Sequence, residues 1–216
     1  MIKLLLGLLG ITGAVVAAAL LIGGGTLLWV DTAMTDSEGF INSKPVGLET
    51  ETYAITTPPA VVEIETPGPI DVGTVATLRI SAENRDPKKG VFIGLAEVAD
   101  LDGYLSEVAY DEIVELEAEP FEATLVAHPG VAAPQTPTAQ AFWTASAHGI
   151  GPQTFTWDVE SGDYAVVLMN EDVSSGVQVE TVVGTRVPVM RPFGTSLLIA
   201  GGIVLVFGTL MIALAI

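Results

Sequence analysis

Residues 153–170 read QTFTWDVESGDYAVVLMN and carry the clearest strand pattern of the chain. Phe155 and Trp157 alternate with threonines, which is the period of a strand that buries one face. After a turn at Ser161-Gly162, residues 164–169 are apolar on both faces, as in a strand at the centre of a sheet. The stretch therefore predicts two strands of a β-domain, one half-buried and one central.

The same period of two continues on both sides of this stretch. It predicts strands over residues 49–56, 60–65, 74–82, 90–97, 110–118, 121–128, 141–147, 153–159, 163–170 and 176–183. Proline and glycine clusters separate these segments, with turns every 8 to 12 residues on average. Short strands with regular turns indicate a mainly β fold, a single β-sandwich of the jelly-roll type.

One segment departs from the strand period and predicts a short helix. Leu101, Tyr104, Leu105 and Val108 have helical spacing, and Asp100 precedes them as a candidate N-cap. We expect this helix to connect two strands of the sandwich.

Two long uncharged segments flank the β-rich part, residues 4–30 and residues 192–216. A bilayer core needs about 20 helical residues, and both segments are longer than that. The first is also too long for the apolar region of a cleaved signal peptide. We predict a transmembrane signal anchor over 1–30, a juxtamembrane linker over 31–48, the sandwich over 49–191 and a transmembrane helix over 192–216.

Flanking charges favour a cell-membrane location with the domain on the extracytoplasmic side. Lys3 precedes the first span, and Asp31, Asp36 and Glu38 follow it. Basic residues near the spans on the domain side point the other way, but long domains are largely exempt from the positive-inside count.

Small residues form faces on both predicted spans. Gly194, Gly201 and Gly208 recur every seven residues, and Gly10 and Gly13 each precede an alanine by four residues. Small faces allow helix backbones to approach closely in lipid. These glycines are therefore candidates for packing one span on the other, on a membrane protein partner or on a second copy.

Composition excludes several classes of function. The chain has 26 acidic and 8 basic residues, and all the basic residues except Lys3 lie between the spans, so the domain carries a net charge of −19. Such a domain repels phosphates, which excludes nucleic acid as a partner. The absence of cysteine excludes disulfides and thiolate chemistry. No sequence motif indicates a cofactor.

Candidate catalytic and metal residues are sparse. Ser146 and His148 do not form a hydrolase motif, because the chain has no Gly-x-Ser-x-Gly elbow. We predict neither a catalytic residue nor a metal site. Calcium remains an open alternative, because clustered oxygen ligands occur at Asp100 with Asp102 and at Asn170 with Glu171 and Asp172.

The order of several short motifs resembles a family of two-span membrane proteins of actinobacterial type with an extracytoplasmic β-domain. The shared pattern is Phe142-Trp143, Ala145-Ser146, Gly149-x-Gly151, Gln153-Thr154, Trp157, Gly162, Val166-Val167 and Met169-Asn170. The resemblance implies an architecture and no activity. This chain departs from the pattern at His148, where a small residue is usual, and at 170–173, where relatives carry an Asp-Gly turn.

Within this pattern the large aromatic residues are expected to be core anchors. Trp143, Phe155 and Trp157 are the candidates, since aromatic side chains contribute the largest buried areas. Asn170 ends a buried strand, where its amide is placed to fix the following loop.

We therefore expect a non-enzymatic, membrane-anchored structural or interaction module, a subunit or accessory of a membrane or cell-envelope assembly. Its partners would be the lipid bilayer and a membrane protein or a second copy. The alternatives are a membrane-tethered extracytoplasmic hydrolase and a ligand or calcium sensor that acts through a partner.

Overall fold

The computed structural model describes residues 2–64, 75–118 and 121–215. The chain divides into two compact units, one made of Met1–Ile41 with Val187–Ile216 and the other of Asn42–Arg186. The first unit is helical and the second is the β-domain.

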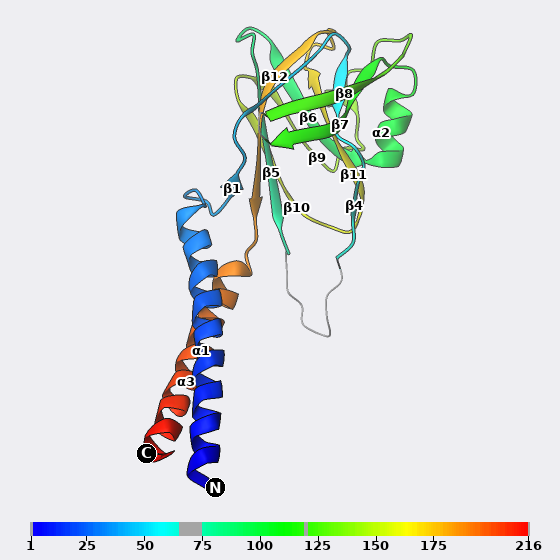
Figure 1. The fold of residues 1–216 in the computed structure, drawn as a ribbon. Helices are drawn as coiled ribbons and strands as arrows, with labels where there is room; N and C mark the ends of the chain where they lie inside the picture. Colours follow the sequence, from blue (N-terminus) through cyan, green and yellow to red (C-terminus); the bar gives the residue numbers. More distant parts are fainter. Residues whose placement is uncertain (1, 65–74, 119–120, 216) are drawn as a thin grey trace. The chain divides into compact units, whose positions relative to one another are not determined.

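The helical unit consists of two long apolar helices, α1 (Ile2–Ala33) and α3 (Met190–Ala215). They lie side by side and antiparallel, with the two chain ends at the same end of the pair (Figure 1). By length and composition, Leu6–Ala33 and Met190–Ala215 are each able to cross a membrane. The two helices therefore support association with a membrane.

The β-domain contains two sheets, as predicted. The first has the order β1-β12-β5-β10, and β2 also pairs with β12. Every pairing of β2, β5, β10 and β12 in this sheet is antiparallel. The strands are β1 (Ile41–Asn42), β2 (Val46–Thr50), β5 (Thr77–Asn84), β10 (Gln153–Asp158) and β12 (Val177–Arg186).

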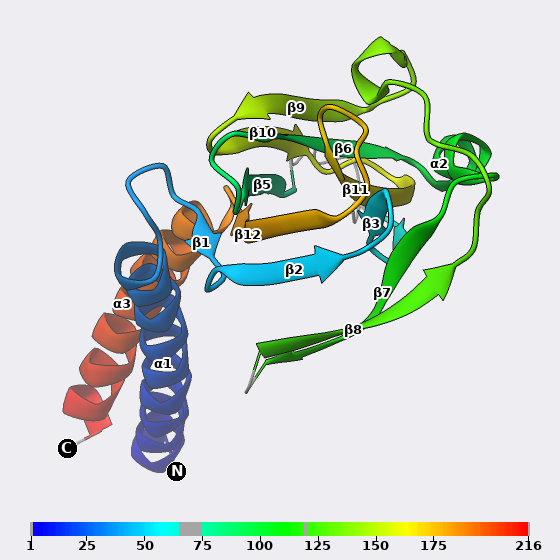
Figure 2. The ribbon, with the colours of Figure 1, turned by 90° about the horizontal axis from the view of Figure 1, so that it is seen from above.

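The second sheet has the order β8-β7-β3-β11-β6-β9, and β4 also pairs with β11. The β3–β7 pairing is parallel, whereas the other pairings are antiparallel. The β7–β8 hairpin forms one edge and extends away from the rest of the domain (Figure 2). The strands are β3 (Ala54–Thr56), β4 (Ala60–Val62), β6 (Gly90–Glu97), β7 (Tyr110–Ala118), β8 (Phe121–His128), β9 (Ala145–Ile150) and β11 (Gly162–Asn170).

The main core lies between the two sheets and confirms the sandwich. Ile80 and Val179 come from the first sheet, and Ile93 and Leu168 come from the second. A second cluster covers the opposite face of the larger sheet, under the short helix α2 (Val98–Leu105). Because β11 contributes to both clusters, it is apolar on both faces, as the sequence predicted for a central strand.

Several predicted boundaries are corrected. The strand predicted over 49–56 is two strands, β2 and β3, which lie in different sheets. The linker predicted over 31–48 contains the end of α1, all of β1 and the start of β2. The strand predicted from Ala141 begins at Ala145, after a 3-10 turn over Pro137–Ala139. One of the proline and glycine clusters expected to separate strands, at residues 67–69, lies outside the described residues.

The short helix confirms the departure from the strand period, but its predicted cap is wrong. Glu97 occupies the N-cap position and makes no side-chain capping bond, whereas Asp100 lies in the first turn. A carboxylate in the first turn is still favourable, because it faces the positive end of the helix dipole.

Candidate functional site

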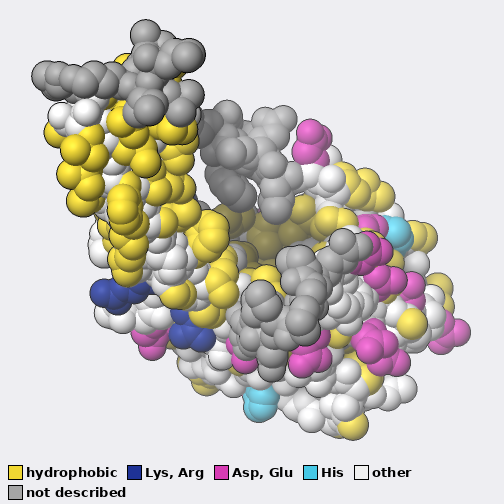
Figure 3. All heavy atoms as spheres, turned by 90° about the horizontal axis from the view of Figure 1, so that it is seen from below, with side chains coloured by type: hydrophobic (Ala, Val, Ile, Leu, Met, Phe, Trp, Pro, Cys, Tyr) yellow, Lys and Arg dark blue, Asp and Glu magenta, His cyan; other side chains and the backbone are white. Residues whose placement is uncertain are grey.

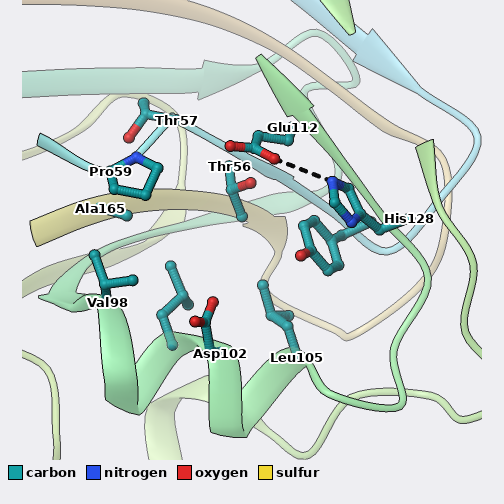
Figure 4. Close-up of a pocket in the computed structure, with 11 residues that line it drawn as sticks. Thr56, Thr57, Pro59, Val98, Asp102, Leu105, Glu112, His128 and Ala165 are labelled. Atoms are coloured by element: carbon teal, nitrogen blue, oxygen red, sulfur yellow. Dashed lines mark hydrogen bonds and ion pairs between the residues drawn. The ribbon is translucent and has the colours of Figure 1, made fainter. Parts of the chain in front are cut away.

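A cleft of about 250 Å³ opens between α2 and the outer face of the larger sheet. The helix supplies one wall with Val98, Asp102 and Leu105, and the opposite side carries Glu112 and His128 (Figure 4). The other lining residues are Thr56, Thr57, Pro59, Leu101, Tyr110 and Ala165. The cleft brings together three partly buried titratable groups, Tyr110, Glu112 and His128.

The register of the β7–β8 hairpin positions the polar groups of the cleft. Tyr110 is directly opposite His128, and their rings stack with centroids 4.4 Å apart and 2° between planes. Glu112 is two residues further along β7 and therefore on the same face. Its Oε2 lies 3.0 Å from Nε2 of His128 (Figure 4). A carboxylate paired with an imidazole is the geometry that holds a histidine in one tautomer.

Negative charge gathers around Tyr110. Burial raises the pKa of the Tyr110 hydroxyl, and the charges of Asp102 and Glu112 raise this pKa further. The phenol is therefore held protonated and able to donate a hydrogen bond. The cleft can bind a ligand that presents a cationic or hydrogen-bonding group. Among the described residues that line it there is no serine or cysteine to act as a nucleophile.

The second histidine forms a separate pair. His148, on β9, places Nδ1 2.8 Å from Oε1 of Glu171 at an exposed site. The two histidines thus pair with different glutamates. Within residues 2–64, 75–118 and 121–215, no group of three or more His, Cys, Asp and Glu side chains is arranged to hold a metal ion.

The residues considered for calcium have other contacts. Asp102 lines the cleft, and Asp100 lies on the same helix. Asn170 is fully buried and accepts a hydrogen bond from Asn84 through Oδ1. Hydrogen bonds from Ser174, first from its hydroxyl and then from its backbone, lower the pKa of Asp172.

Asn170 also fixes the loop that follows β11, as its position in the sequence suggested. Its amide nitrogen donates to the carbonyl oxygens of Ser174 and Gly176, at 2.9 and 3.2 Å. These bonds close the turn between β11 and β12, which belong to different sheets.

The three predicted core anchors lie at different depths. Phe155 is 7% exposed and belongs to the main core. Trp157 is half-buried against that core, with its ring 4.7 Å from the Tyr164 ring. Trp143 is half-buried in the second cluster, where its ring lies 5.0 Å from Phe92 and its Nε1 donates to the Pro137 carbonyl at 2.8 Å.

The predicted glycine faces lie between α1 and α3. Gly194, Gly201 and Gly208 are the buried residues of α3. A Cβ at Gly10 would lie 2.8 Å from the Gly208 carbonyl oxygen, and one at Gly201 would lie 2.9 Å from Cγ of Leu21. Gly13 lies beside Gly208 with more room, at 3.6 Å. The structure thus uses these faces for packing one span on the other.

Gly24 belongs to the same interface and was missed in the sequence. A Cβ there would lie 2.7 Å from the Gly194 carbonyl oxygen. Three glycines are adjacent here, Gly23, Gly24 and Gly25. Only the middle one faces α3, because successive residues are rotated by about 100° around the helix axis. The interface extends from Gly10 to Gly24 along α1, about 21 Å at 1.5 Å per residue.

Sequence reasoning also missed the cleft itself. Glu112 and His128 lie on the β7–β8 hairpin, whereas Thr56 lies on β3, which is distant in the chain, and no local motif joins them. The signal available was weak: Tyr110 and Glu112 share a face, and His128 ends the next strand.

No protein-family model and no curated protein sequence matches this chain. The resemblance to two-span actinobacterial proteins therefore stays a prediction.

Proposed function

We propose that this protein is a non-enzymatic, membrane-anchored interaction module that serves as a subunit or accessory of a membrane or cell-envelope assembly. The observation that carries the proposal is the glycine-lined contact between α1 and α3, in which backbone oxygens approach the positions of missing side chains. Such close packing is typical of helices that associate within lipid. It makes the two spans one anchor for a strongly acidic domain.

The outer surfaces of the helix pair remain available to lipid or to a partner. Phe193, Ile203 and Phe207 of α3 are more than half exposed, at 60%, 53% and 59%. The space-filling view shows hydrophobic side chains covering the helices and acidic ones on the β-domain (Figure 3). We place the domain on the extracytoplasmic side, where its charge suits a basic partner surface.

Purification of the tagged full chain in mild detergent tests the proposal. We expect a second protein to co-elute in fixed stoichiometry through affinity and size-exclusion steps. A parallel purification from cells that lack the tagged chain identifies contaminants. Recovery of the chain alone, folded and at the mass of one copy, would contradict the interaction module.

A membrane-tethered hydrolase is the second candidate, and the Glu112–His128 pair in the cleft favours it. A histidine oriented by a carboxylate can act as a general base toward a bound water. The purified chain is assayed with ester, phosphoester and glycoside substrates. Hydrolysis that is lost in His128→Asn and retained in His148→Asn would support the enzyme, because only His128 lines the cleft.

A further inference from the structure

A second pocket of about 300 Å³ lies inside the β-domain, between the two sheets. Ile80, Thr181 and Val183 line it from the first sheet, and Ile113, Val166 and Leu168 line it from the second. It is separate from the cleft under α2, since of their lining residues only Thr57 is common to both. Figure 3 shows hydrophobic side chains on the floor of a hollow in this domain.

The surface that lines the pocket is apolar. No charged residue lines it among those described, and its hydroxyl groups expose no polar surface to the interior. A wall of this kind favours a hydrocarbon, because water or a polar ligand would find no hydrogen-bond partner there. A volume of about 300 Å³ lies at the lower limit for ligand pockets, so the pocket holds part of a lipid chain and not a whole lipid.

The inward face of β12 shows how deep the pocket reaches. Val179 is fully buried, Thr181 is 6% exposed and Val183 is 40% exposed, so Val183 marks the rim and Thr181 lies one step inside. The Thr181 hydroxyl oxygen is buried and has no hydrogen-bond partner in the described part of the chain. A buried hydroxyl without a partner is costly, and because it exposes no surface to the pocket it offers no hydrogen bond to a ligand.

The rim is tethered to the apolar helices by short segments. Six residues, 184–189, separate Val183 from Met190, the first residue of α3. A segment of that length spans at most about 25 Å, whatever orientation the domain takes. If α3 lies in a bilayer, the rim of the pocket therefore stays within reach of that bilayer's lipids.

We propose that this pocket binds part of one acyl chain of a membrane lipid through its apolar wall. The hydrocarbon occupies the space between Ile80, Ile113 and Leu168, and the headgroup remains outside beyond Val183. The net charge of −19 disfavours anionic headgroups, so the ligand is a zwitterionic or neutral lipid. This site requires the helices to lie in a bilayer but does not depend on a protein partner.

Photocrosslinking tests the site in the full chain. The protein is reconstituted in phosphatidylcholine vesicles that contain a trace of phosphatidylcholine with a diazirine at the end of one acyl chain. After irradiation and digestion, mass spectrometry locates the adducts. We expect adducts on peptides containing Ile80, Ile113 or Leu168, in addition to those on α1 and α3.

Three variants make the result specific. Val183→Trp, which blocks the rim, should remove the adducts in the β-domain, whereas the same change at Val61, which is 70% exposed on β4, should not. Thr181→Val keeps the shape and replaces the unpartnered hydroxyl by a methyl group, so labelling should be retained. Adducts on α1 and α3 report membrane insertion in every sample. If those helices are labelled and the β-domain is not, the lipid site is wrong while the membrane anchor stands.

Discussion

Val173 has φ of +63°, the one non-glycine residue in the left-handed region among those described. It closes the turn after β11, where its amide donates to the Asn170 carbonyl at 3.0 Å. The left-handed region costs a side-chain-bearing residue about 1 to 2 kcal/mol, and a β-branched residue is especially unsuited to it. The hydrogen bonds of Asn170 hold the turn in this conformation despite that cost.

We expect Val173→Gly to stabilise the β-domain by about 1 kcal/mol, because glycine adopts positive φ without strain and its extra unfolded-state entropy offsets only part of the gain. Chemical denaturation of the full chain in mild detergent measures the change. Val61→Gly is the matched control and should destabilise, since Val61 lies in strand β4. Loss of stability in both variants would show that Val173 is not strained.

Trp157 contributes to the core from the edge strand β10. Its ring contacts the Tyr164 ring across the sandwich, with 58° between the ring planes. The Trp157 side chain also packs against the main core. Trp157→Ala should lower the free energy of unfolding by about 2 to 3 kcal/mol, somewhat less than for a fully buried tryptophan. Thr156→Ala, at the exposed neighbouring position, should change it by less than about 0.5 kcal/mol. Equal melting temperatures for both variants would identify Trp157 as a surface residue available for binding.

At the scale of elements, the contact between α1 and α3 depends on the absence of side chains. The glycines of each helix recur on one side and form one flat stripe. A seven-residue repeat rotates by only about 20° around the axis of a straight helix, so the stripe stays on that side. Arg191 and Asp31 add an ion pair at one end of the helix pair, with 3.9 Å between Nε and Oδ2. The Arg191 side chain is 74% exposed, so close packing is the larger contribution.

Gly201→Leu should disrupt the helix pair, because its new side chain would meet Leu20 and Leu21 at about 3 Å. Ile203→Leu is the control, since Ile203 is 53% exposed on the same helix. The measurement is the yield of monodisperse protein in mild detergent and its resistance to proteolysis within α1. If Gly201→Leu behaves like the parent chain, the glycine stripe does not hold the helices together.

The pairing of distant strands is also decided at this scale. β3 joins β7 in parallel, and β2, only three residues before it, joins β12 in the other sheet. The chain therefore crosses between sheets at residues 51–53. This crossing creates the outer face on which Thr56, Glu112 and His128 meet, so the cleft is a product of topology.

For the whole molecule, the side of the membrane on which the domain lies is the next property to measure. Val131 is 98% exposed, and the chain contains no cysteine, so Val131→Cys provides one unique and accessible thiol. On intact cells we expect this thiol to react with a membrane-impermeant maleimide, because the proposed topology places the domain outside. The parent chain is the control for background. Labelling that occurs only after lysis would place the domain in the cytoplasm.

The sequence alone determined the two apolar helices, the mainly β domain between them and the central position of β11. These features follow from local patterns: uncharged runs of sufficient length, a period of two and a segment apolar on both faces. The glycine faces were also visible, because a helix fixes which residues share a side. For the same reason, the short α2 could be recognised although its cap could not.

The tertiary structure alone decided which strands are neighbours, and with them both pockets. A period of two indicates which residues share a face of a strand, but it contains no information on the partner strand or its direction. Tyr110, Glu112 and His128 meet because β7 and β8 pair in one register, and Asp102 faces them because α2 packs on β6 and β11. Thr181 is buried without a partner because two sheets enclose it. Such contacts arise from long-range packing, which is a property of the folded chain and not of any segment.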